Sequence, residues 1–121
     1  MKNILSVDDS FSTLTLVRET LRDEYKVFVV TSGEDALAFL EKQCPDLILL
    51  DFYMMGLDGL ETLEKMNELP DFDIPVIMLT SISTKPLEDS CRELGAVAFL
   101  PKPFDPEDLK KTIREVFEGK H

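Results

Sequence analysis

The sequence has few cysteines and few positively charged residues, and both observations limit the classes of function that it can have. The two cysteines, Cys44 and Cys91, lack the spacing of metal ligands, so we expect reduced residues buried within apolar helical patterns. Against 24 Asp and Glu there are 13 Lys and Arg, which gives a formal net charge of -11. Because nucleic-acid phosphates bind Lys and Arg, this balance argues against nucleic-acid binding and favours metal cations and basic partner surfaces.

Long apolar runs and low-complexity segments are also missing. No apolar stretch approaches the ~20 residues of a transmembrane helix, and the apolar strand that follows residues 1–3 is too short for a signal peptide. We therefore expect a cytoplasmic protein with no membrane partner. With 44% hydrophobic and 31% charged residues, residues 1–121 have the composition of one globular domain.

One stretch gives the first indication of a site: four large aliphatic residues, 47 to 50, run directly into Asp51. A continuous apolar run suits a strand that is covered on both faces, as in a parallel sheet. In such sheets, ligands bind outside the carboxyl ends of the strands. Asp51 would face that site, although an isolated aspartate there could equally begin a turn.

Four other apolar runs alternate with helical patterns along the chain. The predicted strands are Lys2–Val7, Tyr25–Val30, the run from Pro45 to Asp51, Pro75–Thr80 and Ala96–Leu100. The first predicted helix carries Leu14, Val17 and Leu21, and the second runs from a cap within Thr31–Asp35 to about Lys42. The third runs from Asp58 to Leu69, the fourth begins at Pro86 and closes at Gly95, and the fifth begins with the cap Asp105. Strict alternation predicts an α/β fold, with five helices on both faces of a five-stranded parallel sheet.

Polar residues follow four of these strands: Asp8 and Asp9, then Asp51, Thr80 and Lys102. In a parallel sheet they would meet at one edge. Three carboxylates there would repel by ~1 to 4 kcal/mol per close pair, and Mg²⁺ is a cation that oxygen ligands of this kind hold. The Thr80 hydroxyl and the Lys102 amine can stabilise the oxygens of a phosphoryl group. This combination indicates phosphoryl chemistry at Asp51.

Four segments resemble one known family, the receiver domains of two-component response regulators, in a form similar to the chemotaxis regulators. They are Val7–Ser10, Asp51–Gly59, Leu79–Ser81 and Leu100–Phe104, and the resemblance spans essentially the whole chain. It implies a flavodoxin-like doubly wound sheet of strand order 2-1-3-4-5. It also implies a phosphorylation-activated signalling switch that is not an enzyme beyond its own phosphotransfer and slow autodephosphorylation.

The resemblance assigns a role to each residue of the site. Asp51 would accept a phosphoryl group from a histidine kinase or phosphotransfer protein. Asp9 would bind Mg²⁺ directly, and Tyr53 would bind it through its backbone carbonyl. Asp8 would act on the ion through water or through contacts with its ligands. Lys102 would pair with the phosphoryl group.

The resemblance also implies a switch and an output surface. Thr80 would be the switch hydroxyl, Phe99 would move with it, and the Lys102–Pro103 peptide bond would be cis. The fourth helix, fifth strand and fifth helix would then control a downstream effector, a fused output domain or a second copy of the chain.

Two sequence features adjust these expectations. Met55 stands where the family usually has proline, so the loop after Asp51 should be less rigid, although no chemical group is lost. Tyr53 and Ile82 are bulky and cannot readily orient water, which predicts slow loss of the phosphoryl group. His121 is terminal, and we expect no function for it.

Each site residue also has a structural alternative. Asp8 and Asp9 could be a helix-capping pair, Thr80 a turn residue, Lys102 a solvated side chain and Phe99 a core residue.

Three other functions compete at the level of the whole chain. A haloacid-dehalogenase-like phosphatase would need an acid where Tyr53 stands. A flavodoxin-like flavin carrier would place its phosphate against the repelling pair Asp8 and Asp9. A degenerate receiver would serve only as a binding module, although every phosphorylation residue is present.

Overall fold

Strands and helices alternate along the chain as the sequence predicts. The computed structural model describes residues 1–81 and 84–119, and within these ranges it contains five strands and five helices. The strands are β1 (Lys2–Val7), β2 (Tyr25–Val30), β3 (Leu47–Asp51), β4 (Val76–Thr80) and β5 (Ala96–Pro101). The helices are α1 (Phe11–Leu21), α2 (Gly33–Lys42), α3 (Gly59–Asn67), α4 (Lys85–Glu93) and α5 (Pro106–Phe117).

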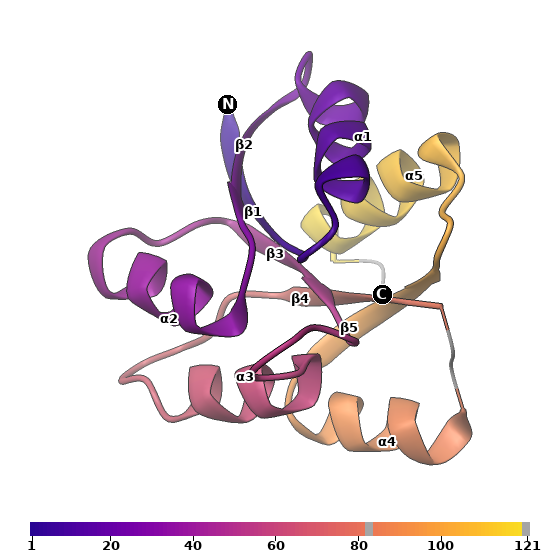
Figure 1. The fold of residues 1–121 in the computed structure, drawn as a ribbon. Helices are drawn as coiled ribbons and strands as arrows, with labels where there is room; N and C mark the ends of the chain where they lie inside the picture. Colours follow the sequence, from indigo (N-terminus) through magenta and orange to yellow (C-terminus); the bar gives the residue numbers. More distant parts are fainter. Residues whose placement is uncertain (82–83, 120–121) are drawn as a thin grey trace.

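All strand pairs are parallel, and the sheet has the order β2-β1-β3-β4-β5 (Figure 1). This confirms the flavodoxin-like fold and its predicted strand order. β3 lies at the centre of the sheet, and all five of its residues are buried. Its register pairs Val7 with Leu50, so the residues that follow β1 lie beside the end of β3.

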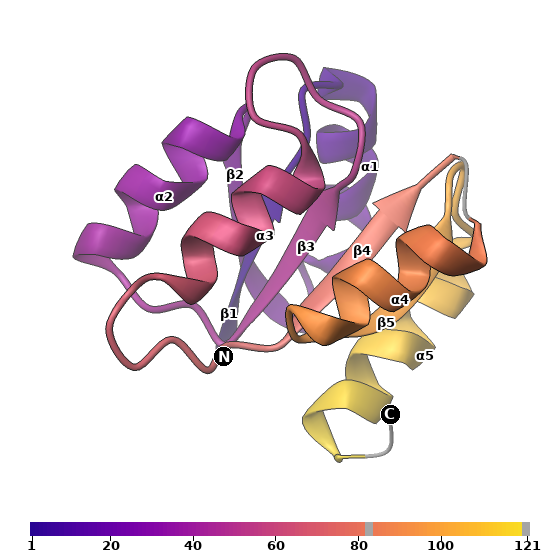
Figure 2. The same ribbon diagram turned by 90° about the horizontal axis from the view of Figure 1, so that it is seen from below.

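Helices cover both faces of the sheet. α1 and α5 lie on one face, and α2, α3 and α4 lie on the other (Figures 1 and 2). Because successive strand residues point to opposite faces, Leu47 and Leu49 pack with α1 and α5, whereas Ile48 and Leu50 pack with α2, α3 and α4. Two apolar cores therefore hold β3 in place from both sides.

The helix starts follow side-chain capping. Asp105 is the N-cap of α5, as predicted, and the N-cap of α2 is Ser32, which lies within the predicted segment Thr31–Asp35. The N-cap of α1 is Ser10, whose hydroxyl accepts the Thr13 N–H, so the alternative of a capping pair at positions 8 and 9 is wrong. The two aspartates are thereby left for another role.

Three local predictions were wrong. Cys44 is exposed, because α2 ends at Lys42 and the chain then continues in an extended conformation, whereas Cys91 is buried as expected. Pro86 is the second helical residue of α4, since the Thr84 side chain accepts the Leu87 N–H and caps the helix one position earlier.

The third wrong prediction concerns α3, which ends at Asn67, before the predicted end at Leu69. Within the described part of the chain, no helix is both long and apolar enough to cross a membrane.

Candidate functional site

The parallel sheet brings the predicted site residues to one edge. Asp51 and Thr80 are the last residues of β3 and β4, and Asp8 and Lys102 directly follow β1 and β5. Backbone hydrogen bonds extend the strand pairing past these ends: the Asp8 N–H donates to Val30 at 3.2 Å, and the Lys102 N–H donates to Thr80 at 3.0 Å. The predicted meeting of these residues at the carboxyl edge is therefore confirmed.

The start of α3 packs against the same edge through a glycine. The Gly59 N–H donates to the Phe52 carbonyl at 2.7 Å. A β-carbon at position 59 would lie 2.6 Å from the Asp51 carbonyl oxygen and 2.7 Å from the Phe52 Cα. The absent side chain thus lets the helix approach the backbone of the residue that carries the central carboxylate.

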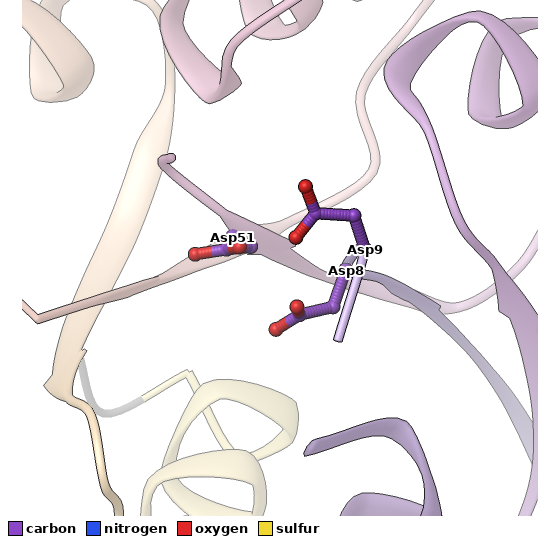
Figure 3. Close-up of side chains that lie close together, drawn as sticks. All are labelled: Asp8, Asp9 and Asp51. Carbon is purple, nitrogen blue, oxygen red and sulfur yellow. The ribbon is translucent and has the colours of Figure 1, made fainter. Parts of the chain in front are cut away.

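The carboxylates of Asp8, Asp9 and Asp51 gather at this edge (Figure 3). Each offers an oxygen within 4.8 Å of the others. Asp8 and Asp51 are 0% and 3% exposed, whereas Asp9 is exposed to solvent. An all-oxygen donor set with one open side suits Mg²⁺, which keeps several waters when bound to proteins. These residues therefore fit the acidic metal site that the sequence predicts.

Lys102 lies between two of the carboxylates. Its Nζ is 2.8 Å from Asp8 Oδ2 and 3.3 Å from Asp51 Oδ1, and its side chain is 19% exposed. Burial lowers the pKa of Lys102, but the hydrogen bond to Asp8 and the charges of Asp8 and Asp51 outweigh burial and raise it. The sequence placed the amine at the site but did not reveal its short ion pair with Asp8.

Asp51 has an unusual carboxyl group. Burial and the neighbouring Asp8 charge raise its pKa to about 6, although Lys102 acts in the opposite direction. One ammonium thus offsets only part of the negative charge of three carboxylates. A divalent cation at this edge would relieve the remaining repulsion.

The loop after β3 supplies a contact that the sequence did not predict. The Met55 N–H donates to Asp9 Oδ2 at 3.2 Å. The family usually has proline at position 55, and proline has no N–H to donate. The methionine in this sequence was therefore the feature from which the contact could have been predicted. Tyr53, whose carbonyl is a predicted ligand, has a 48% exposed side chain packed edge-on against Phe52.

Thr80 and Phe99 line a common surface hollow of about 380 Å³ between α4 and β5. Thr80 is 4% exposed, and the half-buried Phe99 ring lies 4.7 Å from the Arg92 guanidinium of α4. The Lys102–Pro103 peptide bond is cis, which confirms that expectation. The predictions for Ile82 and His121 concern residues outside those that the structure describes.

The sheet order and the acidic edge define a flavodoxin-like α/β domain with a pocket of three carboxylates and a lysine. The chain matches the Response regulator receiver domain model over residues 4–114 and belongs to that family. Membership implies phosphorylation-regulated signalling, a histidine kinase partner and, in general, no catalysis beyond self-phosphotransfer. The phosphatase and flavin-carrier alternatives are therefore set aside.

Similar proteins cover this chain almost completely. It is 34% identical to sporulation initiation phosphotransferase F of Bacillus subtilis (strain 168), over 94% of this chain and 92% of that protein. A crystal structure of the chemotaxis protein CheY4 of Vibrio cholerae superposes with a TM-score of 0.91 at 34% identity, covering 96% of this chain and 98% of that one.

A longer relative shares the domain within a larger protein. The cyclic di-GMP phosphodiesterase response regulator RpfG of Xanthomonas campestris pv. campestris (strain 8004) is 38% identical over 89% of this chain. The chain spans 30% of that protein, and 51% of the transcriptional regulatory protein CpxR of Klebsiella pneumoniae subsp. pneumoniae (strain HS11286).

Proposed function

We propose that this protein is a signalling switch that a histidine kinase or phosphotransfer protein activates by phosphorylating Asp51. The observation that carries the proposal is the environment of this carboxylate. Asp51 is buried at the end of the central strand, it contacts the Lys102 ammonium at 3.3 Å, and it shares the edge with two further acids. Such a group can act as a nucleophile toward phosphorus while cationic groups offset the developing charge.

In the proposed reaction, a carboxylate oxygen of Asp51 forms a bond to the phosphorus of a phosphohistidine. The phosphorus–nitrogen bond breaks, and its electron pair remains on the imidazole nitrogen. The Lys102 amine and the Thr80 hydroxyl would donate hydrogen bonds to the phosphoryl oxygens. Tyr53 and Ile82 would slow hydrolysis of the product by excluding water.

Asp9, Asp51 and the Tyr53 backbone carbonyl would hold Mg²⁺ directly, and Asp8 would act through water or through contacts with these ligands. When bound, this cation neutralises charge shared by the carboxylates and the phosphoryl oxygens. The burial of Asp8 and its short contact with Lys102 support an indirect role for Asp8.

Residues 1–121 would act as one cytoplasmic receiver domain. Phosphorylation would draw Thr80 inward, move Phe99 and change the surface of α4, β5 and α5. That surface would control an effector, an output domain or a second copy of the chain. Nucleic acid would not bind this domain directly, because its net charge is -11. No membrane partner is proposed.

The test is labelling by acetyl phosphate, followed by intact mass. The parent should gain one phosphoryl group in Mg²⁺, Asp51→Asn should gain none, and the exposed control Asp73→Asn should behave like the parent. A chelator should abolish labelling. Labelling of Asp51→Asn, or a rate that ignores the chelator, would contradict the proposal, and an unlabelled parent would favour the binding-module alternative.

A further inference from the structure

Of the three carboxylates at the site, Asp9 is the one that does not contact Lys102. Asp8 accepts hydrogen bonds from Lys102 at 2.8 Å and from the Ser10 N–H at 2.9 Å, and Asp51 contacts Lys102 at 3.3 Å. Asp9 is exposed, and among the described residues its carboxylate has one hydrogen-bond partner, the Met55 N–H at 3.2 Å. Its position therefore depends on a single backbone donor.

That donor joins two loops that are 46 residues apart in the chain. Met55 contributes to the contact through its backbone, since its side chain is 85% exposed. Without the N–H, the Asp9 side chain would sample other rotamers in solvent. With it, Asp9 keeps an oxygen within 4.8 Å of the oxygens of the other two carboxylates.

We propose that Met55 is a positioning residue for the divalent cation, because its backbone N–H restrains Asp9 before the metal binds. The inference rests on the metal site of the proposed function. Hydrogen bonds to ligating carboxylates raise metal affinity by orienting them, and a restrained ligand loses less entropy on binding. The accepting Asp9 oxygen retains lone-pair capacity for the metal.

Isothermal titration with Mg²⁺ alone tests this role without any activity measurement. Three variants at position 55 distinguish the contribution of the backbone N–H from that of the side chain. Met55→Ala keeps the N–H and removes an exposed side chain, Met55→Pro removes the N–H, and a backbone ester at position 55 removes the N–H while keeping the methionine side chain. The ester control matters because proline also restricts the conformation of Met54.

We expect Met55→Ala to bind Mg²⁺ like the parent. The proline and ester forms should bind roughly two- to tenfold more weakly, which is the range for loss of one hydrogen bond to an exposed carboxylate. Parent-like or tighter binding by the ester form would overturn the inference, even if the proline form fails to fold. Equal weakening in Met55→Ala would assign the effect to the side chain and overturn it too. A parent that does not bind millimolar Mg²⁺ would instead overturn the proposed metal site, and this inference would fail with it.

Discussion

Lys102 is the cation that neutralises part of a site with three carboxylates. It contacts Asp8, which is fully buried, and Asp51. Lys102→Met would leave the Asp8 charge buried without its partner. Loss of one member of a buried pair costs ~3 to 5 kcal/mol, and partial solvent access to Lys102 should reduce this to about 2 to 4 kcal/mol of unfolding free energy. Urea denaturation in a chelator measures the loss.

Mg²⁺ should restore part of that stability, because it brings positive charge to the same carboxylates without competition from the ammonium. The increase in melting temperature at millimolar Mg²⁺ should therefore be larger in Lys102→Met than in the parent. Lys111→Met, which removes an exposed lysine of α5, should show the parent's increase. Equal increases in all three proteins would mean that Lys102 and the cation do not share these carboxylates.

The sequence was sufficient to place the site residues but not to pair them. Asp51, Thr80 and Lys102 share an edge because parallel strands end on the same side of a sheet. Their contacts depend on side-chain rotamers and burial, which no periodicity encodes. For that reason the ion pair of Lys102 with Asp8, and the contact of Asp9 with Met55, emerged only from the structure.

Among the elements, α3 is fixed to the site by its first residue. By helix propensity alone, Gly59→Ala would stabilise the helix by about 1 kcal/mol. The added β-carbon would, however, clash with the Asp51 carbonyl oxygen at 2.6 Å. Because both near atoms at 51 and 52 belong to the backbone, the helix or the strand end must shift. We expect a net loss of roughly 1 to 3 kcal/mol of unfolding free energy in urea denaturation.

Glu64→Ala is the matched control for this substitution, since it places alanine at an exposed position of the same helix. It should change stability by less than ~0.5 kcal/mol. If Gly59→Ala were as stable as Glu64→Ala, the contact between α3 and the Asp51 backbone would be looser than the structure indicates.

The types and order of the elements were predictable, because each strand is a continuous apolar run and most helix starts carry a capping residue. The ends were less predictable where local hydrogen bonds decide them. Thr84 caps α4 one residue before the position that Pro86 suggested, and α3 ends at Asn67, before the predicted end at Leu69. Both errors arise from single side-chain or backbone choices that apolar periodicity does not report.

At the scale of the whole molecule, the surface of α4, β5 and α5 carries several cations of an acidic protein. Lys110, Lys111 and Arg114 lie on α5, and Arg92 of α4 lies over the Phe99 ring at 4.7 Å. An inward turn of Phe99 would break this cation–π contact, worth about 0.5 to 1 kcal/mol at an exposed site. Phosphorylation must therefore favour the inward packing by more than this amount if it is to shift the population.

Amide chemical shifts with and without beryllofluoride and Mg²⁺ test whether the signal reaches this surface. A phosphoryl group adds roughly -1.5 to -2 charges at Asp51, which should draw in the Thr80 hydroxyl and the Lys102 amine and release space for Phe99. Shifts should then extend from the β3–α3 loop to α4, β5 and α5. Thr80→Val should still bind beryllofluoride but lose the distant shifts, because it lacks the hydroxyl that, in the proposed mechanism, would couple Asp51 to Phe99. If the shifts are confined to the β3–α3 loop in the parent, or if distant shifts persist in Thr80→Val, then Thr80 and Phe99 do not transmit the conformational change to this surface.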